Sequence, residues 1–300
     1  MTKEEFLKVF TRTDKSDRLG TNENAIKIMA DMLEAHEQCE DEDVRLIAEN
    51  VGIIGKVAPT FTVFESQNSS MYMHNFKAYQ LKVGCPLEVA THEFGHAVLN
   101  IATDTKVPDG FEEVVMNAQK HALLPENKDK FKEYVQYLAK NKDELTTAEK
   151  GPVGDIISSI FQQPGFRIGS FENVCMLPSF HTHDYYFDDE KKCMKLKPIF
   201  DENFANIYTL RTMGAMQELG KLKEIFGEEF FRVMDEQIKN VAQFFERQAS
   251  IGEVQNGFET ENVHSKIMGQ IIGQRSSELV QVIEPREIGI DKNTKGEEKQ

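Results

Sequence analysis

Residues 91–100 read THEFGHAVLN and contain the pattern H-E-x-x-H, formed by His92, Glu93 and His96. Residues four apart on a helix share one face, so the two imidazoles can reach a single metal ion. Glu93 follows the first histidine and can lean toward a water on that metal, whose pKa falls to about 7 on zinc. This stretch therefore predicts a helix that carries a zinc site, with Glu93 as the general base.

The H-E-x-x-H pattern is rare by chance. The chain has 8 histidines and 50 acidic residues among its 300. A random order of these residues gives about 0.04 such patterns, so the match is informative. Gly95 and Ala97 add small side chains beside the histidines, which lets another backbone pack close to them. The alternative interpretation is a pair of surface or core histidines one helical turn apart.

The sequence just before the motif favours β-structure. Phe61–Phe64 and Met71–Val83 are rich in β-branched and aromatic residues with rough alternation, and the polar run Glu65–Ser70 between them is typical of a turn. Pro86 then fits the first position of the helix that carries the motif. We therefore predict two strands followed directly by the metal-binding helix.

Most of the remaining chain has helical patterning. The order helix, strand, helix predicts an α+β fold, mostly helical, with a small β-sheet packed on the motif helix. We predict a helix over about 201–218 and amphipathic helices over 220–248 and about 259–284. The predicted organisation is an N-terminal helical segment (1–55), a core that contains the motif (56–220), C-terminal helices (221–288) and a polar, disordered tail (289–300).

Charge and hydropathy exclude several classes of partner. The net charge is −15 and is spread along the chain without a Lys/Arg cluster, which disfavours binding to nucleic acid. The charged N-terminus lacks the apolar segment of a Sec signal, and no apolar run approaches the roughly 18 residues of a membrane span. We therefore expect a cytoplasmic protein with no nucleic-acid or membrane partner, although export by a signal-independent route stays open.

A catalytic zinc ion needs a third protein ligand and one open position. The extension H-x-x-G-x-x-H does not follow His96, so this ligand must come from farther along the chain. Two candidates are open at this point, namely Glu202 and the pair Glu113 and Glu112.

Four motifs follow one another between residues 85 and 215. They are His92–His96, the run GDIISSI over 154–160, His183–Tyr186 and the run ENFA over Glu202–Ala205. Their order resembles the zincin domains of phage head-associated (MuF-type) and polymorphic-toxin proteins. The run ENFA also resembles the helix that supplies the glutamate ligand in lethal-factor-like toxin metallopeptidases. The resemblance implies a zincin-like metallopeptidase in which Zn²⁺ is held by His92, His96 and Glu202.

The same resemblance implies roles for residues between the metal ligands. Tyr186 and His183, together with Tyr185, are the candidates for a donor that stabilises the oxyanion of a tetrahedral intermediate. Asp155 would accept a hydrogen bond from a ligand imidazole and fix its tautomer. The alternatives are loop aromatics that pack into the core and, for Asp155, an acid in the first turn of a helix.

A second resemblance supports the other candidates for the third ligand. Residues 110–127 read GFEEVVMNAQKHALLPEN and are similar to the E-x-x-A-N…LLMP segment of ImmA/IrrE-like regulatory proteases. This resemblance implies Glu113 or Glu112 as the ligand, and a single protein as the target.

The sequence thus predicts zinc-dependent hydrolysis of a peptide bond. The substrate would be a peptide or protein that adds in extended form to the strand region 71–83 through main-chain hydrogen bonds. Two alternatives stay open: a regulatory protease with one protein target, and a catalytically silent structural or adaptor protein of a phage or mobile element with a zincin fold.

Overall fold

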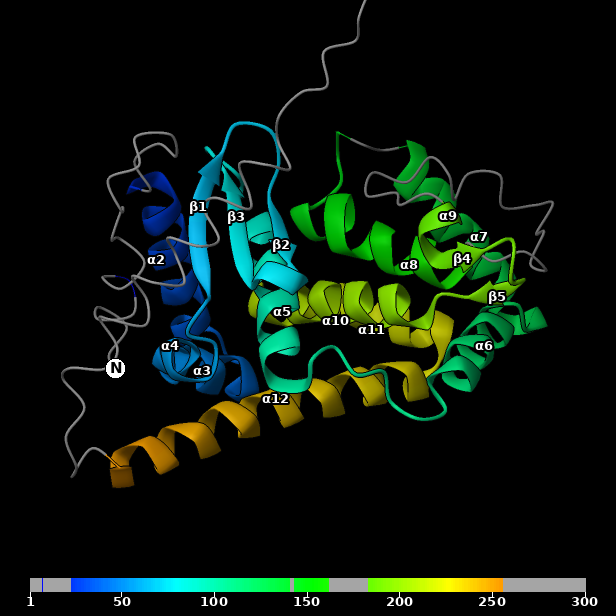
Figure 1. Cartoon of the computed structure of the whole chain (residues 1–300). Helices are drawn as coiled ribbons and strands as arrows, with labels where there is room; N and C mark the ends of the chain where they lie inside the picture. The colour runs from blue at the N-terminus through cyan, green and yellow to red at the C-terminus, as the bar shows by residue number, and fades with distance from the viewer. Residues whose placement is uncertain (1–6, 8–22, 141–142, 162–182, 256–300) are drawn as a thin grey trace, which may run out of the picture. The chain divides into compact units, whose positions relative to one another are not determined.

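The structure, a computed structural model, describes residue 7 and residues 23–140, 143–161 and 183–255. It is a mostly helical α+β fold with a small three-stranded mixed sheet and a separate two-stranded sheet (Figure 1). The predicted fold class is confirmed at this level. The predicted helix over 259–284 and the predicted tail over 289–300 lie outside the described residues.

The H-E-x-x-H motif lies on α5 (Leu87–Thr103), as its spacing predicts. Pro86 has an extended backbone and stands just before the helix, so α5 begins one residue later than predicted. The helix ends at Asp104, whose φ of 55° is left-handed. Its inner face buries Phe94 and Val98 completely, which fixes the rotation of the helix and hence the side from which its histidines project.

Helix α10 (Leu196–Thr212) packs along α5 more extensively than any other pair of described elements. Gly95 makes the close approach possible, because a Cβ atom built on it would lie 2.9 Å from Cα of Ala205. Only glycine fits such a contact between backbones without a shift. The helix over 201–218 was therefore predicted correctly in kind, although it begins and ends about five residues earlier.

The three-stranded sheet contains β1 (Thr62–Ser66), β2 (Met71–Met73) and β3 (Ala78–Lys82). The strand order is β1-β3-β2, with β1 parallel and β2 antiparallel to β3. The prediction of one strand over 71–83 was wrong, since a short 3₁₀ turn, η2 (His74–Phe76), separates β2 from β3. Lys77 follows the turn with a left-handed φ of 47° and reverses the chain. Strand β2 therefore lies at an edge, and both β2 and β3 contact α5.

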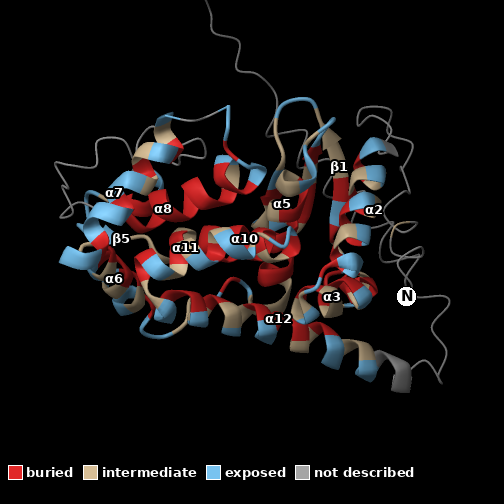
Figure 2. Ribbon diagram, turned by 180° about the vertical axis from the view of Figure 1, so that it is seen from behind, coloured by how far each residue is buried: buried red, intermediate tan, exposed pale blue. Residues whose placement is uncertain are grey.

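The other elements surround the crossing of α5 and α10, and Figure 2 shows how strongly α8 and α10 are buried. The long predicted helix over 220–248 is divided at Gly227, whose φ is 84°. The two-stranded sheet lies outside the strand regions that the sequence predicts, 61–64 and 71–83. The remaining elements are α2 (Glu23–Gln38), α3 (Glu42–Glu49), η1 (Val51–Ile53), α4 (Ile54–Val57), α6 (Phe111–Ala122), α7 (Pro125–Lys140), η3 (Glu149–Val153), α8 (Gly154–Phe161), α9 (His183–Tyr186), β4 (Phe187–Asp188), β5 (Cys193–Met194), α11 (Met216–Phe226) and α12 (Glu228–Gln255).

One hydrophobic core joins the segments that the sequence predicts as separate. Leu33 of α2, Phe204 of α10 and Phe231 of α12 are all fully buried within it. The predicted boundaries at 55/56 and 220/221 fall inside α4 and α11. Within the described ranges, no helix is both long and apolar enough to cross a membrane.

A partly exposed ion cluster also ties these segments together. The guanidinium of Arg211, near the end of α10, contacts Asp43 at 3.0 Å and Asp235 of α12 at 3.3 Å. It also bonds Asp41, which is the N-cap of α3. Residues from three separate helical segments are therefore held by a single cation.

Candidate metal centre

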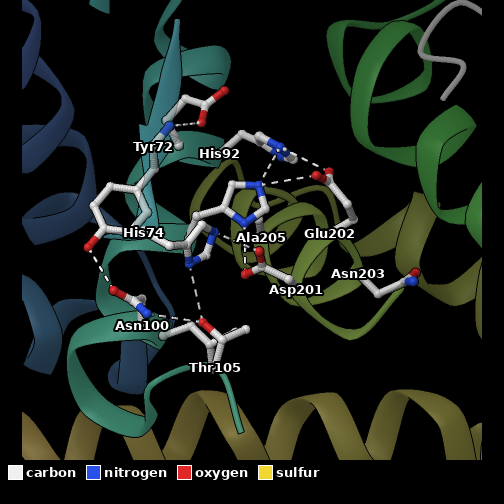
Figure 3. Close-up of polar contacts among 12 residues, drawn as sticks. Tyr72, His74, His92, Asn100, Thr105, Asp201, Glu202, Asn203 and Ala205 are labelled. Atoms are coloured by element: carbon white, nitrogen blue, oxygen red, sulfur yellow. Dashed lines mark hydrogen bonds and ion pairs between the residues drawn. The ribbon is translucent and has the colours of Figure 1, made fainter. Parts of the chain in front are cut away.

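The two imidazoles of the motif converge with one carboxylate. Nε2 of His92 lies 3.1 Å from Nε2 of His96. The carboxylate of Glu202 lies 3.4 Å from His92 Nε2 and 3.6 Å from His96 Nε2 (Figure 3). Zinc–ligand distances of about 2.0–2.2 Å in a tetrahedral arrangement place neighbouring ligand atoms about 3.3–3.5 Å apart. The two separations from Glu202 are close to this spacing and the one between the imidazoles is slightly shorter, and together the three groups could hold a metal.

The crossing of α5 and α10 explains this convergence. Ala205 faces Gly95 at the contact between the helices, and Glu202 lies three residues before Ala205 on the same face of α10. Glu202 is thus directed at the turn of α5 that carries the histidines. His96 and Glu202 are buried, whereas the side chain of His92 is 19% exposed, so among the described residues the cluster meets solvent at His92.

A second carboxylate contacts the other side of His96. Oδ1 of Asp201 lies 2.9 Å from His96 Nδ1, and Oδ2 of Asp201 lies 3.0 Å from His74 Nε2. A metal-bound histidine usually donates its other N–H to such an acceptor. The sequence prediction missed Asp201 in this role, although its place directly before Glu202 was a signal that could have found it.

The buried carboxylates change the acid–base properties of His96. Burial lowers the pKa of its imidazole, but Asp201 and Glu202 outweigh burial and raise that pKa to about 10. Burial raises the pKa of Asp201, yet the positive charges of His96 and His74 hold it well below its usual range. The pocket thus favours a positive charge between the carboxylates, which a proton or a metal cation can supply.

His74, His96 and Asp201 form a second group that could hold a metal ion. Its distances of 2.9 and 3.0 Å are those of close ion pairs between an imidazole and a carboxylate. They are shorter than the spacing expected around a tetrahedral zinc ion. The group that includes Glu202 therefore fits zinc better.

Glu93 is held by the edge strand. Its Oε2 accepts the backbone N–H of Tyr72 of β2 at 2.7 Å. The ring of Tyr72 is anchored in turn, because its hydroxyl donates to Asn100 Oδ1 at 3.0 Å. The proposed base is thereby fixed next to the histidine cluster on one side and the sheet edge on the other.

The tyrosine that reaches the cluster is Tyr185. Its hydroxyl donates to Oε1 of Glu202 at 3.3 Å, and its side chain is 41% exposed. Burial, together with Glu202, raises the pKa of Tyr185, so it stays a proton donor. Tyr186 is fully buried and hydrogen-bonded to Asp155. The backbone of His183 belongs to α9, but its side chain lies outside the described part of the chain.

Asp155 lies in the first turn of α8, as one of its two interpretations expected. It accepts a hydrogen bond from Asn206 Nδ2 at 2.7 Å and another from Tyr186. The carboxylate in contact with a ligand imidazole is instead Asp201. Asp155 therefore fastens α8 to α10 beneath the site.

Glu112 and Glu113 lie in the first turn of α6, and both are exposed. Among the described residues, the groups with metal-binding geometry contain neither of them. The geometry therefore favours Glu202 as the third ligand.

Comparisons with known proteins add no assignment. The chain matches no protein-family model, and neither the curated proteins nor the solved structures give a match. The interpretation of the site therefore depends on the arrangement of its own residues.

Proposed function

We propose that this protein is a zinc-dependent metalloendopeptidase of the zincin type. The observation that carries the proposal is the convergence of His92, His96 and Glu202 at ligand spacing, with Glu93 on the same helical turn. Two imidazoles and one carboxylate form a ligand set found in catalytic zinc sites that keep a fourth position open. The access on the side of His92 agrees with such an open position.

Each protein group then has a distinct task. When bound, zinc would polarise the scissile carbonyl and acidify a water molecule. Glu93 takes the proton from the attacking water and passes it to the nitrogen of the leaving amine. Tyr185, rather than the buried Tyr186, has the exposure and position to donate to the developing oxyanion. His183 stays a candidate for the same task on the sequence pattern alone.

The edge strand β2 is where we propose that an extended substrate binds. In the three-stranded sheet β2 pairs only with β3, and it also contacts α5. A peptide that adds to an open sheet edge is held mainly through main-chain hydrogen bonds. This arrangement would bring the peptide backbone alongside Glu93, which the amide of Tyr72 holds.

The decisive test is the variant Glu93→Gln. It should retain one equivalent of zinc but lose nearly all hydrolysis, because the amide cannot accept the proton. Glu88→Gln, in the first turn of the same helix, is the matched control and should remain active. Cleavage of a denatured protein mixture is followed by mass spectrometry, and zinc content by elemental analysis. Undiminished hydrolysis in Glu93→Gln would disprove the mechanism.

The same measurements separate the two alternatives. A protein that binds zinc but cleaves no component of the mixture is either catalytically silent or restricted to a single target. Those two cases differ in whether Glu93→Gln alters the lifetime of one protein in the native cell.

A further inference from the structure

We propose that His74 is a positioning residue that acts through Asp201 on the metal ligand His96. The inference rests on the proposed zinc site, although it concerns metal affinity and not hydrolysis. His74 has no metal-ligand spacing in the sequence, and nothing there connects it with the motif. The structure brings its ring next to Asp201 and beside the ring of His96, as Figure 3 shows.

The contacts form one continuous chain of polar groups. His96 Nδ1 faces one oxygen of Asp201 at 2.9 Å, and His74 Nε2 faces the other at 3.0 Å. Nδ1 of His74 then lies 3.4 Å from the hydroxyl oxygen of Thr105. An ionised carboxylate can only accept, so both nitrogens that face it must carry protons. With one proton held on Nδ1, Nε2, which faces His92 and Glu202, is the nitrogen of His96 that could bind a metal ion.

The chain joins three separate elements. His74 belongs to η2, directly after the edge strand, whereas Asp201 is on α10 and His96 on α5. The ring of His74 is restrained by an edge-on contact with Tyr72, at 5.1 Å between centroids. The side chain of His74 is 30% exposed and that of Asp201 only 7%. A substitution of His74 should therefore leave the fold intact and still change the position of the buried Asp201 carboxylate.

Without His74, Asp201 loses a proton donor and gains freedom to rotate away from His96. Partners of this kind typically contribute 10- to 100-fold to metal affinity. We expect His74→Phe to weaken zinc binding about tenfold. His74→Gln should recover much of this loss, since the amide nitrogen of glutamine can take the place of Nε2 and donate to Asp201.

The experiment measures zinc affinity by competition with a chromophoric chelator. The matched control is His121→Phe, which removes a histidine that also has two polar partners but lies away from the cluster. This control should leave zinc affinity unchanged. The proposal is supported if affinity falls in His74→Phe, recovers in His74→Gln and stays constant in His121→Phe.

Several results would overturn the proposal. One is zinc affinity in His74→Phe within twofold of the wild type. Another is a second bound zinc that is lost in His74→Phe and kept in His92→Ala. This result would make His74, His96 and Asp201 a metal site of their own. The zinc-loaded wild type gives a check without variants, since long-range ¹H–¹⁵N spectra must show His96 protonated at Nδ1.

Failure of this inference differs from failure of the proposed function. If the wild type binds zinc but hydrolyses nothing, the function fails while the affinity test of His74 still decides the inference. If the wild type binds no zinc, the proposed function and the inference both fail. If only the His74 variants behave like the wild type, the inference alone fails.

Discussion

Helix α10 carries two clusters of charged side chains, one partly exposed and one with buried carboxylates, that differ in how their charge is balanced. Near its end, the guanidinium of Arg211 contacts three aspartates and provides a permanent cation. Near its start, Asp201 and Glu202 face imidazoles, which are cations only when protonated. Carboxylates shielded from water are costly without a partner. In the first cluster Arg211 supplies the balancing positive charge, so no further cation is needed. The second needs a proton or a metal ion, which is the property of a binding site.

The largest expected effect is the loss of zinc affinity when a proposed metal ligand is removed from the second cluster. Glu202→Ala takes away the only carboxylate among the three proposed ligands, so we expect zinc affinity to fall by more than about 100-fold, beyond the loss typical of an indirect partner. Elemental analysis after dialysis measures the stoichiometry. Glu113→Ala is the control, because that carboxylate is exposed on α6. Full zinc occupancy in Glu202→Ala would move the third ligand elsewhere.

Zinc itself should stabilise the fold. At a free concentration of about 1,000 times Kd, an ion that binds only the native state adds about 4 kcal/mol to the free energy of unfolding. Urea unfolding with and without a chelator measures this gain. At the same zinc concentration the gain should fall to about 1.4 kcal/mol or less in Glu202→Ala and persist in variants of the Arg211 cluster. Equal stability of the metal-free and zinc-loaded wild type would contradict the comparison.

Removal of the Arg211 guanidinium should lower the stability of the fold without changing zinc binding. Arg211→Met leaves three partly exposed aspartates without their shared partner, and we expect a loss of about 2–3 kcal/mol, below that for fully buried ion pairs. The variant should still bind one equivalent of zinc at temperatures where it is folded. A loss of zinc affinity as large as that of stability would mean that the two clusters are coupled along α10.

The smallest expected effect comes from the helix crossing. Gly95→Ala places a methyl group 2.9 Å from the backbone of α10, and such overpacking costs about 1–3 kcal/mol. Because the added atom pushes apart the two helices that hold the ligands, zinc affinity should fall as well. Gly220→Ala, whose Cβ would meet open space, is the control and should be neutral or slightly stabilising.

The sequence predicts the parts of this site that depend on local spacing. The separation of four positions between His92 and His96 suffices to place both imidazoles on one face of α5. Glu202 could be proposed only from the order of the motifs, and Glu113 remained a rival until the helices were placed. Both candidates are acids on helices, and only the crossing at Gly95 and Ala205 distinguishes them.

The parts that sequence reasoning missed depend on contacts between distant segments. His74 and Asp201 are far apart along the chain, and no periodicity records that they meet. The strand over 71–83 was predicted as continuous because its composition favours β-structure, whereas the left-handed Lys77 divides it. Tyr185 and Tyr186 were both candidates from the motif, and only burial separates them, because neighbouring residues in a short helix point in different directions.

The separation of the ligands along the chain has a consequence for folding. A cation shared by His96 and Glu202 would be a cross-link that closes the whole length of chain between α5 and α10. Closing so long a loop removes much conformational freedom from the unfolded ensemble, as a disulfide does. Helices α6, α7 and α8 lie within that loop, so the ion would also help to keep in place elements that it never touches.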